Sequence, residues 1–232
     1  METLPKRGFS RAEIMRRVAR FKTLKGSDGG LPDSHMPGCE RTLINVIGFQ
    51  PPDGEGDAVT SPVGGDAARA AAIPISEGFN LGYCKAKPGH GPMMHNHDTN
   101  ETFIPMTGKW RCSWENEMGK VEHVDLDPLD VISFPAGAIR RFENVTSGDR
   151  DQENILMFVI GGNSPRAEFT DKAMQELAAA GVWPPKLIHL AILPHDDVGS
   201  VVQPTTGVIA HGAACNTQEE VPMGSIGVPP TA

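Results

Sequence analysis

Apolar and polar residues alternate over short segments in the middle of the chain, a pattern typical of β-strands with one buried face. In one segment Trp110, Cys112 and Trp114 occupy every second position and so share a face. These side chains either line a cavity or form a stripe in the core or at a dimer interface. No long helix separates the segments, so the pattern predicts an all-β sandwich or barrel. The predicted strands are residues 42–49, 79–87, 101–106, 110–114, 120–126, 131–134, 140–144 and 154–160.

Helices are predicted on either side of the strands. Ser10 and Glu13 form a capping-box pattern at the start of an amphipathic segment, which predicts a helix over residues 10–24. Its apolar stripe is expected to pack on the barrel or on a partner subunit, and contact with an anionic surface is the alternative use of its basic face. A second, short helix is predicted from Thr170 or Asp171 to about residue 180.

The chain is expected to contain one folded domain with extensions, because 232 residues are few for two full domains. We place an N-terminal helix and loop in residues 1–40, a β-barrel domain in residues 41–195 and a C-terminal arm in residues 196–232. Residues 50–66 are predicted to be a loop, and residues 187–193 an additional edge strand. The arm has no aromatic residue and nine Gly or Pro, which favours a segment with little core of its own.

The candidate chemistry lies in one stretch, around His95, His97 and Glu101. The two histidines are two positions apart, so a strand points both imidazoles to the same face. The three residues after His97 favour a turn, and Glu101 is then expected to begin the next strand beside the histidines. Two imidazoles and one carboxylate on one face form the ligand set that suits a non-haem Fe(II).

This stretch resembles the first motif of the cupins, in which a glycine, His-x-His, a glutamate and a second glycine recur at set spacing. Here the fixed positions are Gly89, His95, His97, Glu101 and Gly108. The resemblance covers about residues 79–162. It implies a cupin-type jelly-roll β-barrel that binds a divalent metal and a small organic molecule.

The second cupin motif is only partly present, in residues 130–144. Leu129 stands where a glycine usually precedes the aspartate, and Arg140 stands where the family usually has a histidine as the fourth metal ligand. A guanidinium has no lone pair to donate to a cation, so Arg140 cannot take over that role. His90 and His123 are the nearest other histidines in the sequence that could supply a fourth ligand.

Three interpretations of Arg140 follow from the sequence. It pairs with Glu101 and replaces the metal, it holds a substrate carboxylate beside a three-ligand metal, or a shift in register turns it to solvent like Arg141. We favour the second of these. An inward position is supported because Phe142 and Asn144 share the parity of Arg140 in the predicted strand.

Charge and composition exclude some classes of partner. The net charge is −8, but residues 1–25 hold eight Lys or Arg and the remainder carries −14, which argues against nucleic acid as a partner. No apolar run approaches the ~18 residues of a membrane span, and the N-terminus lacks the apolar core of a signal peptide. The four cysteines form no Cys-x-x-Cys pair, so free thiols in a reducing cytoplasm are expected, with Cys84 and Cys112 as packing residues.

The resemblance therefore leads to a metal-dependent cupin enzyme, and a dioxygenase-type oxidoreductase on a small carboxylated or phenolic substrate is the preferred interpretation. His95, His97 and Glu101 would hold Fe(II), with Mn, Ni or Zn as other candidates, and Arg140 would orient the substrate anion. A non-catalytic module that binds a small ligand and a metal-dependent lyase or isomerase are the alternatives. We expect a cytoplasmic homodimer with a small-molecule substrate and with neither nucleic acid nor membrane as partner.

Overall fold

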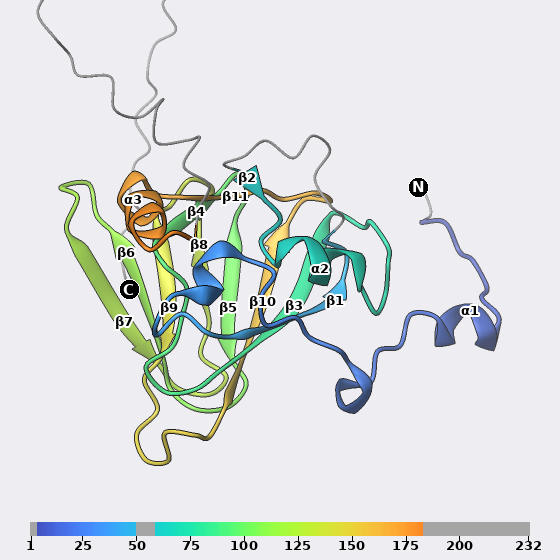
Figure 1. The fold of residues 1–232 in the computed structure, drawn as a ribbon. Coiled ribbons are helices and arrows are strands. Elements are labelled where there is room, and N and C mark those ends of the chain that lie inside the picture. The colour runs from blue at the N-terminus through green and yellow to red at the C-terminus, as the bar shows by residue number, and fades with distance from the viewer. Residues whose placement is uncertain (1–3, 50–58, 183–232) are drawn as a thin grey trace, which may run out of the picture. The chain divides into compact units, whose positions relative to one another are not determined.

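Two antiparallel sheets form most of the computed structural model, which describes residues 4–49 and 59–182 (Figure 1). One sheet has the strand order β1 (Thr42–Ile47), β3 (Phe79–Ala86), β10 (Asn154–Gly161), β5 (Glu101–Pro105) and β8 (Ile132–Phe134). The other has the order β2 (Val59–Thr60), β11 (Ala167–Phe169), β4 (His95–His97), β9 (Arg140–Asn144), β6 (Trp110–Glu115) and β7 (Val121–Leu126). Such a pair of sheets is the cupin-type jelly roll, so the predicted all-β fold is confirmed.

The core lies between the two sheets and is built from alternate residues of each strand. In β10, for example, every second side chain is buried, as a strand with one core-facing side requires. Phe103 of β5 and Phe142 of β9 join the sheets, with ring centroids 5.1 Å apart and the rings edge to face. Trp110 and Cys112 are fully buried in this core, so their alternation reflects core packing rather than a cavity wall.

Each of the eight predicted strands is present, with ends that differ from the prediction by at most two residues. The largest difference is at the end of β1, where Gly48 and Phe49 both have positive φ and turn the chain away. Helix α2 (Gly64–Arg69) was not predicted, since it lies at the end of the Gly-rich segment interpreted as a loop. Its buried face packs beside β1, where the Asn45 side-chain amide donates to the carbonyl of Ala67.

The N-terminal helix is much shorter than predicted. The capping box at Ser10 and Glu13 is present, but helix α1 (Arg11–Met15) ends after five residues and a separate 3-10 turn follows at Phe21–Thr23. None of its residues is buried, and Ile14 remains 45% exposed. A capping box starts a helix, but packing of an apolar face is needed to extend it, and α1 buries none of its residues. Beyond the helix, the Phe21 ring contacts the Tyr83 ring.

The C-terminal helix agrees with the prediction. Helix α3 (Asp171–Ala179) has Thr170 as its N-cap, whose side chain accepts a hydrogen bond from the Ala173 amide. It buries Leu177 against a small cluster that includes Phe169 of β11. The predicted edge strand at 187–193 and the arm at 196–232 lie outside the described residues. Among the helices of residues 4–49 and 59–182, none is long and apolar enough to cross a membrane.

Candidate metal centre

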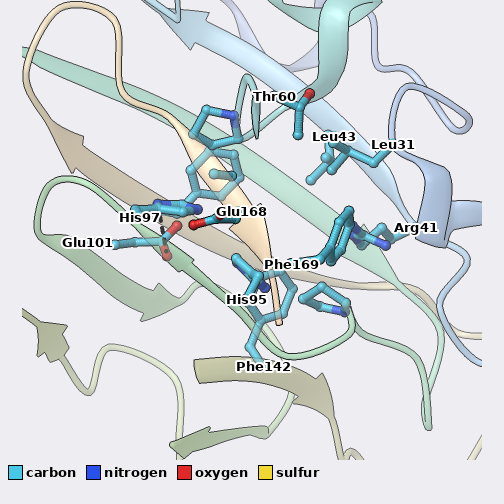
Figure 2. Close-up of a pocket in the computed structure, with 14 residues that line it drawn as sticks. Leu31, Arg41, Leu43, Thr60, His95, His97, Glu101, Phe142, Glu168 and Phe169 are labelled. Carbon is cyan, nitrogen blue, oxygen red and sulfur yellow. Dashed lines mark ion pairs between the residues drawn. The ribbon is translucent and has the colours of Figure 1, made fainter. Parts of the chain in front are cut away.

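The three candidate ligands meet across the interior of the barrel. His95 and His97 lie on β4, whereas Glu101 begins β5 in the opposite sheet, because the turn at residues 98–100 carries the chain from one sheet to the other. One ligand atom from each of the three residues lies within 4.8 Å of the others. The predicted convergence is therefore found, and Figure 2 shows Glu101 next to His97.

Both imidazoles present a nitrogen that is free to bind a cation. The Nδ1 atom of His95 lies 2.8 Å from the carbonyl oxygen of Met93, so Nδ1 carries the proton and Nε2 keeps its lone pair. The Nδ1 atom of His97 is buried without a hydrogen-bond partner and lies 3.7 Å from Oε2 of Glu101. Burial and the nearby Arg140 charge lower the pKa of His95 to about 3 and hold the pKa of His97 well below its usual value. Both rings are therefore neutral at pH 7.

Arg140 points inward and pairs with Glu101. Its side chain is 1% exposed, and its Nε and Nη2 atoms both donate to Oε2 of Glu101, at 3.1 and 2.5 Å. Its Nη1 atom lies 3.4 Å from the carbonyl oxygens of His95 and Ala138. Because the Arg140 side chain is buried, the third possibility, a register shift that turns Arg140 to solvent, is wrong. Arg141 is partly exposed and pairs with Glu143.

The pairing with Arg140 leaves half of the Glu101 carboxylate unused. Burial raises the pKa of Glu101, and the permanent Arg140 charge opposes that rise. Both donated bonds go to Oε2, and no described residue donates a hydrogen bond to Oε1. Oε2 therefore accepts from Arg140 and also lies 3.7 Å from Nδ1 of His97, while Oε1 accepts no hydrogen bond from the described residues.

A divalent metal fits these residues. Two neutral imidazoles and one carboxylate oxygen without other partners form an established donor set, and a bound ion would satisfy the buried Nδ1 of His97. Ligand atoms about 2.0–2.2 Å from one ion lie within about 4.4 Å of one another. The present spread of 4.8 Å is close to that limit, so small side-chain rotations suffice.

The other histidines of the described residues do not join the site. His90 is at the surface, with Nδ1 3.1 Å from Oε2 of Glu40. His123 lies on the exposed strand β7. The predicted substitutes for the fourth ligand are thus absent from the centre, and the ligand cluster found in residues 4–49 and 59–182 consists of His95, His97 and Glu101.

The three residues open onto a small, mostly apolar cavity of about 30 Å³, which has room for about two water molecules. In Figure 2, His97 and Glu101 lie on one side of the drawn cluster, and Leu31, Leu43 and Arg41 lie on the opposite side. Further apolar walls come from Phe142, Phe158 and Phe169.

Sequence reasoning missed a second buried ion pair beside this cavity. Nη2 of Arg41 donates to Oδ1 of Asp33 over 2.9 Å, and both side chains are almost fully buried. The other Asp33 oxygen accepts the backbone N–H of Met93 at 3.0 Å, two residues before the first histidine. Asp33 belongs to a 3-10 turn (Pro32–His35) in a Gly- and Pro-rich segment without periodicity, so no sequence signal placed it in the interior.

Two motif positions outside the centre have backbone conformations with positive φ. Gly108 has φ +70°, and a Cβ atom there would lie 2.4 Å from side-chain atoms of Asn154 and Thr146, so the turn after β5 requires glycine. Leu129, which replaces the usual glycine of the second motif, also has a positive φ of +77°. The conformation of the motif is thus retained although the residue has changed.

Comparison with known proteins finds similarity to solved structures alone. No protein-family model matches the chain, and no curated protein matches it. Among solved structures, an oxalate decarboxylase from Lactobacillus farciminis in a formate complex is 12% identical with a TM-score of 0.43, over 75% of this chain and 40% of that one. A hazelnut (Corylus avellana) vicilin is 14% identical with a TM-score of 0.41, over 65% and 35%. A cupin-superfamily protein from Desulfitobacterium hafniense is 13% identical with a TM-score of 0.31, over 38% and 70%.

The chain thus spans about two fifths or less of the decarboxylase and the vicilin. The Desulfitobacterium hafniense protein is described as a cupin-superfamily protein, and the cluster of His95, His97 and Glu101 has the residues of the first cupin motif. The resemblance to the cupins rests on that motif and on the arrangement of the two antiparallel sheets.

Proposed function

We propose that this protein is a metal-dependent cupin enzyme in which His95, His97 and Glu101 hold one divalent ion. The observation that supports the proposal most directly is Nδ1 of His97, which is buried without a hydrogen-bond partner and lies 3.7 Å from the Glu101 carboxylate. Leaving a buried polar atom unpaired costs about 1–3 kcal/mol, and a bound cation removes that cost. Fe(II) is the favoured ion, with Mn, Ni and Zn as the other candidates.

The proposed reaction is a dioxygenase-type oxidation of a small carboxylated or phenolic substrate. A bound Fe(II) would supply redox chemistry and, with only three protein ligands, open positions for O₂ and substrate. The protein's own contribution is to hold the ligands and to exclude water, which the apolar walls around Phe142 and Phe158 support.

Arg140 takes a positioning role in this proposal. Its Nε and Nη2 atoms are engaged by Glu101 and its Nη1 atom faces two backbone carbonyls, so little of the guanidinium remains for a substrate anion. By holding Oε2, it fixes the Glu101 carboxylate beside His97 and leaves Oε1 without a hydrogen bond from the described residues. The permanent positive charge also weakens the attraction of the site for a cation, which an anionic substrate would offset.

A metal-free module that binds a small ligand is the second candidate function. It is favoured by the same ion pair, because Arg140 already neutralises the carboxylate that would otherwise attract a cation.

A metal-dependent lyase or isomerase differs from the dioxygenase in consuming no oxygen. Measurement of O₂ uptake by the metal-loaded protein with candidate carboxylates separates these two reactions.

The metal itself is tested by competitive titration and elemental analysis of the native protein and three variants. Native protein should bind about one ion per chain, and His97→Ala should lose at least about 100-fold in affinity because a ligand is removed. His123→Ala, which changes an exposed histidine away from the centre, is the matched control and should bind as the native protein does.

Arg140→His separates the two candidate functions. It removes the neighbouring positive charge and offers a further imidazole, so metal binding should tighten by about 10- to 100-fold. If native protein takes up none of Fe(II), Mn(II), Ni(II) or Zn(II) and Arg140→His does, the metal-free interpretation is correct. If neither protein binds any of the four ions, the metal-dependent proposal is overturned.

A further inference from the structure

The cavity contains a second arginine whose binding capacity is only partly used. Arg41 lies at the start of β1, is buried, and lines the cavity together with His95, His97 and Glu101. Figure 2 shows Arg41 on the side of the cavity opposite His97 and Glu101. A molecule in the cavity would therefore have these two candidate ligands on one side and Arg41 on the other.

The hydrogen bonds of Arg41 leave donors available. Its Nη2 atom donates to Asp33 and its Nη1 atom donates to the carbonyl oxygen of Cys39 at 2.7 Å. A guanidinium has five N–H donors and no acceptor, so three donors have no acceptor among the described residues beyond these two bonds. Buried N–H groups require acceptors, and a carboxylate is the acceptor that a guanidinium fork fits best.

The charges around the cavity also point to an anion. Asp33 balances Arg41, and Glu101 balances Arg140, so the interior is neutral in the absence of a metal. Glu168, the remaining acidic residue among those that line the cavity, is exposed to solvent. A divalent ion would add two positive charges to a buried, low-dielectric place, and an anionic ligand would reduce that excess.

We propose that Arg41 anchors the carboxylate of a small anionic ligand in this cavity and so restricts the substrate class to small carboxylates. The inference rests on the proposed function, because the ligand is a substrate only if the metal centre beside it is catalytic. The ligand would lie between Arg41 and that centre. Asp33 acts as a positioning residue, because it fixes the guanidinium and accepts the Met93 amide beside the ligand strand. A cavity of about 30 Å³ favours molecules of few heavy atoms.

Isothermal calorimetry with acetate and its neutral analogue acetamide tests the anchor, using full-length protein with and without bound metal. The native protein should bind acetate about 10- to 100-fold more tightly than acetamide, the factor for a hydrogen bond to a charged group. The test variant is the double substitution Asp33→Asn with Arg41→Gln, which removes both charges together and avoids an unpaired buried ion. Arg41→Lys retains the charge, and Arg69→Gln changes an exposed arginine as the control.

The double variant should fold cooperatively, keep the metal affinity of the native protein within about threefold, and lose about 10- to 100-fold in acetate affinity. Arg41→Lys should recover part of that loss, and Arg69→Gln should lose none. Acetate binding that is equal in native protein and folded double variant overturns the anchor, as does a native protein that binds no acetate or prefers acetamide. If the double variant does not fold, the Lys variant and the acetamide comparison still decide.

The two proposals fail separately. If native protein binds metal but acetate affinity does not depend on Arg41, this inference is wrong and the metal proposal stands. If no metal binds while acetate binding still requires Arg41, the metal proposal is wrong and the anion site stands.

Discussion

The two buried arginine–carboxylate pairs that the structure describes differ in which partner has hydrogen-bonding capacity left: the carboxylate in one pair and the guanidinium in the other. In the pair of Arg140 and Glu101, the guanidinium faces the carboxylate and two backbone carbonyls, and one carboxylate oxygen has no hydrogen bond from the described residues. In the pair of Arg41 and Asp33, both carboxylate oxygens accept hydrogen bonds, and three guanidinium donors have no acceptor in the part of the chain that the structure describes.

This difference assigns different tasks to similar pairs. A carboxylate with a free oxygen can take a cation, whereas a guanidinium with free donors can take an anion. Buried ion pairs add little stability by themselves, because the cost of removing both charges from water offsets their attraction. We therefore infer that both pairs are arranged for binding, with the metal on one side of the cavity and the ligand anion on the other.

Removal of Asp33 is the largest expected effect on stability. Asp33→Ala leaves the Arg41 charge buried without its partner and the Met93 amide without its acceptor, which should lower the free energy of unfolding by about 3–5 kcal/mol. Urea denaturation in the presence of a chelator measures this loss. The exposed pair of Asp66 and Arg69 supplies the control, since Asp66→Ala should cost less than about 0.5 kcal/mol.

The comparison is sharpened by repeating the Asp33→Ala measurement with acetate present. If the uncompensated guanidinium binds acetate, the ligand should restore part of the lost stability, and it should do so with the metal removed. A loss below about 1 kcal/mol would instead indicate that Asp33 is not the partner on which the Arg41 charge depends.

The sequence predicted the first pair far better than the second. The spacing of His95, His97 and Glu101 is a local signal, and strand parity placed Arg140 inside, so its pairing with Glu101 across 39 positions was among the possibilities, although contact with a substrate carboxylate was preferred. Asp33 has no such pattern, because its 3-10 turn lies in a segment rich in Gly and Pro, where neither helical nor strand periodicity applies.

Element ends were predictable only where local chemistry decides them. Thr170 caps α3 and set its start correctly, but the end of α1 depends on packing that the capping box at Ser10 does not report. The sheet pairings depend on long-range packing between strands, so the alternation of residues predicted the strands themselves but not β2 or β11, which are only two and three residues long.

A buried thiol provides a pH-dependent test of the Arg41 region. Burial raises the pKa of Cys84 from 9.0 to about 12, with Arg41 opposing the rise and Asp33 adding to it. The unfolded chain therefore loses this proton near pH 9 while the folded protein keeps it, so the stabilising contribution is complete below pH 9 and is lost as the pH rises toward 12. In Cys84→Ala, stability should fall less steeply between pH 9 and 11, by about 1.4 kcal/mol per pH unit.

Urea denaturation of reduced protein at several pH values measures both slopes. Because burial is the largest cause, the double substitution Asp33→Asn with Arg41→Gln should keep the native slope. If its slope changes as much as that of Cys84→Ala, the ion pair rather than burial controls the thiol. Equal slopes in native protein and Cys84→Ala would show that the thiol is not shielded in the folded state.

The smallest expected effect concerns Leu129, the other position at which the second motif departs from the cupin pattern. Arg140 has a buried partner that accounts for its presence, whereas the Leu129 side chain is 73% exposed and its φ is +77°. A left-handed conformation costs a non-glycine residue about 1–2 kcal/mol, and glycine costs about 0.5–1 kcal/mol in the unfolded state. Leu129→Gly should therefore raise the free energy of unfolding by about 0.5–1 kcal/mol and leave metal and acetate binding unchanged.

Met118 supplies the matched control for this substitution, because it is 67% exposed in another turn but is not among the residues with positive φ. Met118→Gly gains no relief of strain, so it should lower the free energy of unfolding by about 0.5–1 kcal/mol. Chemical denaturation of both variants gives the sign of each change. If Leu129→Gly is destabilising to the same extent as Met118→Gly, the positive φ of Leu129 carries no strain. Leu129 would then not differ from Arg140 by lowering the stability of the protein.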